Sequence, residues 1–220
     1  MDQATDLFLA LTPEKVLDAV EDAGLQCNPV CHALNSYENR VYDIQLADET
    51  HLVAKFYRPQ RWSREQILEE HRLMNDLEAA EVPICGLRRF PDGSTLRIKE
   101  DIYYCLYDRF GGRAPQDFDH QLAERLGMLL GRLHNVGAAG TSDHRIHLDS
   151  NTYVRGNLKW MMEQETIPVH LEARYAEAAN GLAEIADRRM VGVDTIRIHG
   201  DFHAGNLLVR EETLHVLDFD

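Results

Sequence analysis

The chain has 220 residues, enough for one large domain or two small lobes, and its 44% hydrophobic and 27% charged residues are typical of a globular protein. A formal net charge of −14 argues against non-specific nucleic-acid binding, which needs clustered Lys and Arg. No run of about twenty apolar residues is present to span a membrane. The N-terminus also lacks the basic region of a secretory signal, so we expect a cytoplasmic protein.

The four cysteines are not expected to form a disulfide framework. They stand at Cys27, Cys31, Cys85 and Cys105 in a chain too long for a disulfide scaffold. Cys27 and Cys31 have the spacing C-x3-C, and no second pair follows them. We therefore expect buried reduced thiols in preference to a zinc site.

The N-terminal region is predicted to contain a helix followed by a β-hairpin. Thr12 and Pro13 have the pattern of an N-cap and a first helical position, and Gly24 marks the end of an amphipathic stretch. The segments RVYDIQL and HLVAKFY, residues 40–46 and 51–57, alternate between apolar and polar residues. This alternation predicts two antiparallel strands.

A second helix and two further strands follow. Ser63 and Gln66 have the spacing of a capping box, which predicts a helix over residues 64–80. Residues 95–100 and 102–107 are β-branched and aromatic, and they favour strands.

Beyond Gly111 and Gly112 the pattern becomes helical. Helices are predicted over residues 119–137, 153–164 and 169–189. The first of them has a leucine face made of Leu122, Leu126, Leu130 and Leu133.

These elements predict an α+β fold with two lobes. Residues 1–110 would form a β-rich lobe, and residues 111–220 a helical lobe. The second lobe is expected to end with a strand at 196–201, a loop and a hairpin.

The final hairpin is the most informative feature. Two short apolar strands, residues 207–209 and 215–217, flank a polar turn. If the hairpin is symmetric about Glu212, Asn206 lies directly opposite Asp218, and such residues have Cβ atoms about 4.5–5.5 Å apart. An amide and a carboxylate would then meet at the open end of the hairpin.

Asp201 precedes Asn206 by five residues within HGDFHAGN. Protein kinases use the spacing D-x4-N, in which the Asp accepts the proton of the substrate hydroxyl and the Asn holds magnesium. A second metal-binding Asp comes from a following strand end, which is the place of Asp218. Oxygen ligands suit Mg²⁺. The joint spacing favours a phosphoryl-transfer site.

Two other interpretations remain open for the same residues. Asn206 and Asp218 are also common turn formers, and His199 is also compatible with a hydrogen-bonded core histidine. A zinc site of His199, His203 and Asp218 is the other alternative, although it lacks the helical HExxH frame.

A cation for the phosphates is predicted in the strand HLVAKFY. Leu52, Ala54 and Phe56 would face one side of this strand, and Val53, Lys55 and Tyr57 the other. An ammonium in mid-strand among apolar residues needs an anionic partner, because burying an unpaired charge is costly. Glu70 is the candidate, since it shares the apolar stripe of the helix over 64–80, whereas Glu69 is expected to face solvent.

The loop NSYENRVY, residues 35–42, precedes the hairpin where a phosphate-covering turn would lie. It has no glycine, so it is neither a kinase Gly-rich loop nor a Walker A motif. Ser36 and Asn39 are candidate donors to phosphate oxygens.

Together, HGDFHAGN and the following VLDFD resemble the signature of the aminoglycoside phosphotransferase and choline kinase superfamily, relatives of the protein kinases. Within that superfamily, NSYENRVY, VAKFYRPQRW and QILEEH are similar to bacterial serine/threonine protein kinases of the stress response. The resemblance extends from about Leu34 to Asp220.

The resemblance implies a protein-kinase-like fold and a role for each matching residue. Asp201 would be the catalytic base, and Asn206 and Asp218 the magnesium ligands. Lys55 would hold the α- and β-phosphates of ATP and would be braced by Glu70.

The remaining implied contacts are to the nucleotide. Ser36 would line the ATP site. The segment YCLYDRFGG would be the hinge that reads adenine, with Asp108 and Phe110 as contacts.

Two departures from the family pattern matter. The kinase D-F-G becomes Asp218-Phe219-Asp220, without the glycine. The family also continues for about a hundred more residues of helix, so the helical lobe is expected to be incomplete at its C-terminal end and the chain to be a fragment of a longer enzyme.

The resemblance implies ATP- and Mg²⁺-dependent phosphorylation of Ser and Thr hydroxyls of proteins, by a monomer with no nucleic-acid or membrane partner. A small-molecule kinase is the first alternative. Its acceptor would meet the acidic side chains Glu163, Glu165 and Glu172, which a solvated helix face explains equally well. The second alternative is non-enzymatic: a nucleotide-binding regulatory fragment, or an inert fragment.

Overall fold

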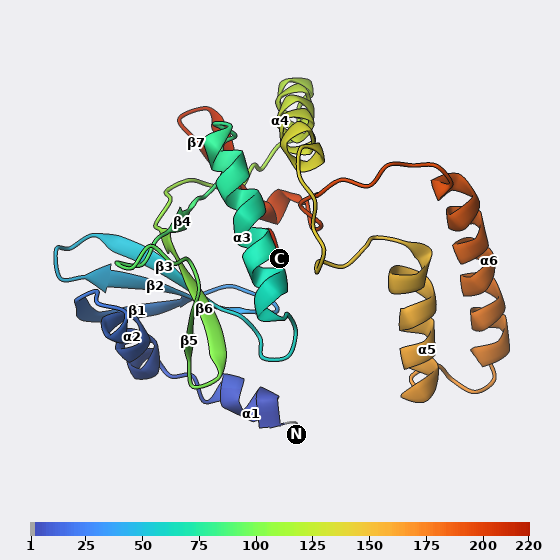
Figure 1. The fold of residues 1–220 in the computed structure, drawn as a ribbon, viewed down its shortest axis with the longest axis horizontal. Helices are drawn as coiled ribbons and strands as arrows, with labels where there is room; N and C mark the ends of the chain where they lie inside the picture. Colours follow the sequence, from blue (N-terminus) through green and yellow to red (C-terminus); the bar gives the residue numbers. More distant parts are fainter. Residues whose placement is uncertain (1–2) are drawn as a thin grey trace. The chain divides into compact units, whose positions relative to one another are not determined.

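The computed structural model describes residues 3–220, with side chains from Asp6 onward. They form two compact units (Figure 1). The first comprises the chain up to residue 142 together with residues 196–220, and the second comprises residues 143–195. The predicted lobes, 1–110 and 111–220, divide the chain differently, and that boundary stays a prediction.

An antiparallel sheet of six strands organises the first unit. Its strands are β1 (Cys27–Leu34), β2 (Arg40–Leu46), β3 (His51–Phe56), β4 (Leu87–Arg88), β5 (Arg97–Lys99) and β6 (Ile102–Asp108). The order is β1-β2-β3-β6-β4, and β5, which is not part of this path, also pairs with β6. The predicted hairpin of β2 and β3 is confirmed, with Val41 paired to Lys55. The sequence interpretation did not include β1.

Two helices precede the sheet, α1 (Gln3–Leu9) and α2 (Pro13–Asp22). As predicted, Thr12 caps α2, with its side chain accepting a hydrogen bond from Lys15 N at 3.4 Å. Gly24 follows with a φ of 91°, a left-handed conformation that glycine adopts without strain. In Figure 1 α2, in dark blue, lies beside β1.

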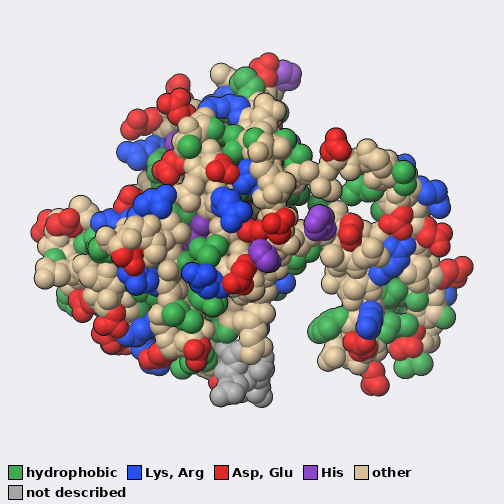
Figure 2. Space-filling view, in the orientation of Figure 1, with side chains coloured by type: hydrophobic (Ala, Val, Ile, Leu, Met, Phe, Trp, Pro, Cys, Tyr) green, Lys and Arg blue, Asp and Glu red, His purple; other side chains and the backbone are tan. Residues whose placement is uncertain are grey.

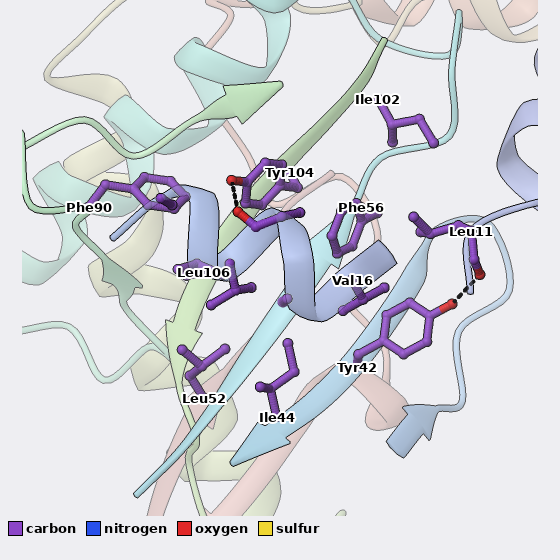
Figure 3. Close-up of a cluster of buried hydrophobic side chains, with 14 of the residues drawn as sticks. Leu11, Val16, Tyr42, Ile44, Leu52, Phe56, Phe90, Ile102, Tyr104 and Leu106 are labelled. Carbon is purple, nitrogen blue, oxygen red and sulfur yellow. Dashed lines mark hydrogen bonds between the residues drawn. The ribbon is translucent and has the colours of Figure 1, made fainter. Parts of the chain in front are cut away.

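The core between α2 and the sheet is apolar (Figure 3). It is built from the face of β3 that carries Leu52, Ala54 and Phe56, as the alternation predicted. Two buried hydroxyls are satisfied by backbone: Tyr42 donates to Leu11 O at 3.3 Å, and Tyr104 donates to Ala19 O at 2.7 Å. This side of the sheet is therefore structural, and the opposite face carries Lys55.

Helix α3 (Arg64–Ala79) lies on the Lys55 side of the sheet. Its capping box is confirmed: Gln66 N donates to Ser63 Oγ at 3.2 Å, and Ser63 N donates to Gln66 Oε1 at 2.9 Å. The expectation that Glu69 faces solvent is wrong. Glu69 is 4% exposed and accepts a hydrogen bond from Ser142 Oγ at 2.5 Å, because the chain after α4 covers this side of α3.

Helix α4 (His120–Ala138) and the hairpin of β7 (Leu207–Arg210) and β8 (Thr213–Val216) share a second apolar core with α3. Leu129 takes the buried place expected for Leu130. A short 3-10 turn, Ala204–Asn206, leads into β7. Val216 anchors the hairpin to the chain after α3, since Val216 N donates to Pro83 O at 3.1 Å.

The predicted register of this hairpin is wrong by one residue. Leu207 pairs with Val216 and not with Leu217, so Asn206 is opposite Leu217. The cause is a two-residue turn in which Glu211 and Glu212 have φ values of 48° and 66°, as in a type I′ turn. Residues other than glycine, asparagine and aspartate rarely adopt this backbone conformation. Two glutamates therefore did not indicate a two-residue turn, and the predicted turn was longer.

The strand predicted at 196–201 is also wrong. These residues are extended but join no sheet, and Arg197 N instead donates to Gly137 O at 3.4 Å. The approach is close: a Cβ on Gly137 would lie 2.1 Å from Arg197 O. The guanidinium of Arg197 reaches Asp76 on α3 at 2.7 Å and Val136 O at 3.1 Å, so it ties α3 and α4 to the start of the following loop.

The second unit is helical. It contains a π-helical turn at Asn151–Arg155, α5 (Gly156–Glu163) and α6 (Glu172–Met190). Asp187 holds the turn against α6 by accepting from Ser150 Oγ and from Arg155 Nη2, the latter at 2.7 Å. Both predicted helices are therefore confirmed.

Acidic side chains are spread over the visible face of the protein and do not gather into one patch (Figure 2). Among the described residues, no helix has both the length and the apolar composition needed to cross a membrane.

Candidate active site

A buried ammonium lies at the centre of the site. Lys55, near the end of β3, is 3% exposed. Its Nζ lies 3.7 Å from Glu70 Oε1 and 2.8 Å from Asp218 Oδ1, and it also contacts Asp220 Oδ1. The predicted pairing of Lys55 with Glu70 is thus present in the structure. We call these four residues the Lys55 group.

The electrostatics of the Lys55 group follow from burial and from its charge balance. Burial alone would lower the pKa of Lys55, but Glu70, Asp220 and Asp218 outweigh it and raise that pKa above its ordinary value. The pKa of Asp220 is lowered, because Lys55 and hydrogen bonds overcome its burial. Burial, aided by Asp220, raises the pKa of Asp218 despite Lys55. Three carboxylates facing one ammonium leave an excess of negative charge.

Asn39 is buried beside this group. Its Nδ2 donates to Asp220 Oδ2 at 2.7 Å, and its Oδ1 accepts from Arg58 N at 3.2 Å. Ser36, three residues earlier, is exposed in the loop between β1 and β2. The structure therefore brings Asn39 to the Lys55 group, while the ATP contacts predicted for Ser36 and Asn39 stay predictions.

The loop before β7 is held by His199. His199 Nε2 donates to Leu217 O at 3.0 Å, and its Nδ1 accepts from Asp201 N at 3.2 Å. Burial lowers the pKa of His199, which favours the neutral ring that this pattern requires. Because both ring nitrogens are engaged, His199 has none left for zinc, and the structure gives no support to the zinc alternative.

Asp201 is open to solvent although its backbone is fixed. Its side chain is 67% exposed, and its carbonyl accepts from Asn206 Nδ2 at 3.0 Å. An exposed carboxylate on an anchored loop is available to a hydroxyl that approaches from solution. His203 braces the same loop by accepting from Gly205 N at 3.0 Å.

The hairpin joins this loop to the Lys55 group. Leu217 N donates to Asn206 O at 3.1 Å, so Asp218 follows directly after the residue that pairs with Asn206. Asp218 has a φ of 64°, a left-handed conformation, and its carboxylate reaches Lys55. Asn206 and Asp218 are thus neighbours across the hairpin end, although they are not directly opposed.

The donor set suits magnesium bound together with a nucleotide. Within residues 3–220, no group of three or more His, Cys, Asp and Glu side chains is arranged to hold a metal ion by itself. Mg²⁺ needs few protein ligands, because it keeps waters and takes phosphate oxygens. Asp218 and the amide oxygen of Asn206 fit that role, and the excess negative charge of the Lys55 group favours a divalent cation.

The two predicted hinge contacts have other partners. Asp108 is exposed and forms an ion pair with Arg88 at 2.8 Å. The ring of Phe110 lies 4.2 Å from that of His215, and the guanidinium of Arg210 lies 5.1 Å above Phe110. Their roles in adenine recognition stay predictions.

Sequence reasoning missed three residues of this region. Asp220 was noted only as a replacement for glycine, yet it contacts Lys55 and Asn39. Its partners are far away in the sequence, so no local pattern pointed to these contacts. Tyr57 and His71 are buried behind Glu70, and the alternation of β3 had placed Tyr57 on the face of Lys55.

The fold is that of the protein-kinase-like phosphotransferases, as the resemblance implied. The amicoumacin kinase hAmiN, solved in complex with AMP-PNP, Ca²⁺ and Ami, superposes with a TM-score of 0.78 over 98% of this chain and 66% of that chain, at 19% identity. The chain belongs to the phosphotransferase enzyme family APH, whose model matches residues 30–220.

Two curated relatives are more similar in sequence. Stress response kinase A of Escherichia coli O157:H7 is 34% identical over 217 residues, which are 98% of this chain and 66% of the relative. The serine/threonine protein kinase RdoA of Salmonella typhimurium is 34% identical over 210 residues, which are 95% of this chain and 64% of the relative. The chain thus spans just under two thirds of the length of these relatives.

Proposed function

We propose that the protein transfers the γ-phosphoryl group of ATP to Ser and Thr hydroxyls of proteins. The observation that carries the proposal is the buried ammonium of Lys55 among Glu70, Asp218 and Asp220, joined through one hairpin to the exposed carboxylate of Asp201. Phosphoryl transfer has a loose transition state, so a site acts mainly by positioning and by charge neutralisation.

The position of each residue in the site suggests its role in phosphoryl transfer. Lys55 would leave Asp218 and Asp220 to bind phosphate oxygens, while Glu70 keeps the ammonium in place. Asp201 would accept the proton of the attacking hydroxyl. Asn206 and Asp218 are the residues that would hold Mg²⁺, which would supply positive charge against the negative charge of the phosphates.

A protein acceptor is favoured by the relatives. Both are 34% identical over nearly the whole chain, and one is named a serine/threonine protein kinase and the other a stress response kinase. We accordingly propose a stress-response role for the present protein, in the cytoplasm where ATP and magnesium are available.

A small-molecule acceptor is the second candidate. The second unit contains a cavity of about 410 Å³ lined by Tyr153, Trp160 and Tyr175 among others. It is an open surface hollow whose three named rings are each about half exposed, and that aromatic lining is the observation that favours an organic molecule. The acidic residues predicted to attract a cationic acceptor, Glu163, Glu165 and Glu172, do not line it.

The test measures transfer from radiolabelled ATP with magnesium to a generic protein acceptor and, in parallel, to a panel of amino alcohols. Label in protein alone supports the proposal, and label in an amino alcohol alone supports the second candidate. Asp201→Asn is expected to abolish transfer while calorimetry still detects nucleotide binding. Asp194→Asn, at an exposed aspartate outside the loop, is the matched control.

Nucleotide binding has its own measurement. Because a ligand that binds only the folded state raises the melting temperature, Mg-ATP is expected to stabilise the chain. No shift at millimolar Mg-ATP contradicts the proposal and favours an inert fragment.

A further inference from the structure

A set of buried polar side chains lies behind Glu70, on the side away from solvent. Tyr57 and His71 are each 1% exposed, and Thr95 is 8% exposed. Tyr57 Oη lies 3.2 Å from Glu70 Oε1 and 3.1 Å from His71 Nε2. His71 Nδ1 lies 2.8 Å from Thr95 Oγ1. These contacts connect a loop, a helix and the end of a strand in one unbroken line.

Counting hydrogen-bond donors and acceptors fixes which atom donates in each of these three hydrogen bonds. Glu70 faces the ammonium of Lys55, and an ionised carboxylate can only accept. Tyr57 has one proton, which therefore points to Glu70, since otherwise two oxygens would meet without a hydrogen between them. His71 Nε2 must then donate to Tyr57.

The same reasoning extends to the end of the line. A neutral imidazole carries one proton, so with Nε2 donating, His71 Nδ1 must accept. Thr95 supplies the donor. Burial, and to a lesser degree the ammonium of Lys55, lower the pKa of His71 to about 3, in agreement with a neutral ring. The Sγ of Cys105, 3.5 Å from Tyr57 Oη, is able to donate or accept and changes nothing in this order.

We propose that Thr95, His71 and Tyr57 form a directional hydrogen-bond relay that positions Glu70 against Lys55. None of the three touches the reacting atoms, so all are positioning residues. The inference rests on the proposed function, because the pair that it serves is the one proposed to bind nucleotide phosphates.

The relay would keep Glu70 next to Lys55, which the ion pair between these two residues does not do by itself. Lys55 has three competing carboxylates, and two of them, Asp218 and Asp220, lie near the end of the final hairpin. Only Glu70 is on a helix, and its neighbour His71 fastens that helix to the loop at Thr95. The ring of Tyr57 also lies 4.9 Å from Lys55 Nζ, so it guides both members of the pair.

The test compares matched variants of the full chain. Tyr57→Phe removes the donor to Glu70 but keeps the ring. Thr95→Val removes the distal hydroxyl, and Thr95→Ser restores it. Tyr104→Phe is the control, since Tyr104 is equally buried on the opposite face of the sheet and loses one hydrogen bond, to Ala19 O.

Calorimetric affinity for Mg-ATP is the first readout. A hydrogen bond to a charged group is strong, so we expect Tyr57→Phe to weaken binding about tenfold and Thr95→Val about threefold. Thr95→Ser and Tyr104→Phe are expected to bind like the unmodified chain. If Tyr57→Phe binds Mg-ATP as tightly as Tyr104→Phe, the proposal is overturned, even where both variants lose thermal stability.

The tautomer of His71 is the second readout, and it separates the relay from the proposed function. Nitrogen-15 NMR is expected to show Nε2 protonated in the unmodified chain and in Thr95→Ser, and a mixture of tautomers in Thr95→Val. If the unmodified chain does not bind Mg-ATP, the proposed function fails and the relay is judged by this spectrum alone. A proton on Nδ1 in the unmodified chain overturns the relay in either case.

Discussion

The Nζ of Lys55 lies 2.8 Å from Oδ1 of Asp218, so the side chains proposed to bind phosphate and metal are paired with each other. On the proposed function, Mg-ATP would replace this ion pair, with Lys55 free to bind phosphate and Asp218 free to hold the cation. The ion pair joins the buried ammonium of Lys55 to a carboxylate that is 40% exposed.

Replacing Lys55 tests this pairing. Lys55→Met keeps the length of the side chain but leaves Glu70 and Asp220 buried without their cation. We expect the free energy of unfolding to fall by about 3–5 kcal/mol and the stabilisation by Mg-ATP to vanish. Urea denaturation with and without nucleotide measures both effects.

The control for Lys55→Met is Lys15→Met. Lys15 pairs with Glu100 at 2.7 Å on the surface, where such a pair contributes at most about 1 kcal/mol. Equal losses for the two variants would contradict the buried pairing.

Asn206→Ala tests the metal assignment. Losing one oxygen ligand is expected to raise the magnesium concentration needed for half-maximal ATP binding by about tenfold, ~1.4 kcal/mol. Asn75→Ala is the control, since Asn75 is an α3 residue hydrogen-bonded to Arg89 at 3.1 Å. A metal titration identical in both variants would count against Asn206 as a ligand.

The low pKa of His71 predicts a loss of stability in acid. Burial and Lys55 lower the pKa to about 3 from an ordinary value of 6.5. Between these values the unfolded chain binds a proton that the folded chain does not. Stability therefore falls as the pH falls, by ~1.4 kcal/mol per unit well below pH 6.5.

His71→Gln removes this titration, although it also disturbs the contacts with Tyr57 and Thr95. Denaturant midpoints from pH 7 to pH 4 are expected to fall less steeply for this variant than for the unmodified chain. The same replacement at the exposed His32 should leave the slope unchanged, and equal slopes in all three proteins would refute the prediction.

Two glycines of α4 are expected to respond in opposite ways to alanine. A Cβ on Gly137 would lie 2.1 Å from the carbonyl oxygen of Arg197, so Gly137→Ala should lower the free energy of unfolding by about 1–3 kcal/mol. Nothing lies within 4 Å of a Cβ on Gly131, and there alanine should stabilise the helix by about 1 kcal/mol. Thermal melts of both variants check the signs, and shifts of the same sign would show that the close approach is absent.

The hairpin turn offers a stabilising change. Glu211→Asn with Glu212→Gly supplies residues that adopt positive φ readily, so we expect a gain of about 1–2 kcal/mol. Replacing both by alanine removes the same charges but keeps the unfavourable conformation. A similar melting temperature for the two double variants would mean that charge, and not backbone conformation, governs this turn.

Much of the fold was predictable because it depends on local patterns. The alternation of β3 placed Lys55 on the face opposite Phe56, and the apolar stripe of α3 placed Glu70 within reach. The capping box of Ser63 and Gln66 located the start of that helix. In each case residues close together in the sequence determine which way a side chain faces or where a helix begins.

The errors came from contacts made at long range or from unusual backbone. Glu69 is buried, and Ser142, from the distant chain after α4, donates to its carboxylate. Residues 196–201 have the alternation of a strand, but Gly137 offers them a helix end instead of a strand partner. The hairpin register depends on two glutamates that adopt a conformation usually left to glycine or asparagine.

The backbone of Asp218 has a positive φ, so the residue proposed to bind magnesium lowers the stability of the fold. A left-handed conformation costs an ordinary side chain about 1 kcal/mol or more, and glycine or asparagine would largely remove that cost. A screen that selects for thermal stability alone is therefore expected to enrich Asp218→Asn or Asp218→Gly. On the proposed function, such variants would be more stable but would lose a magnesium ligand, so a screen at this position has to measure phosphoryl transfer as well as stability.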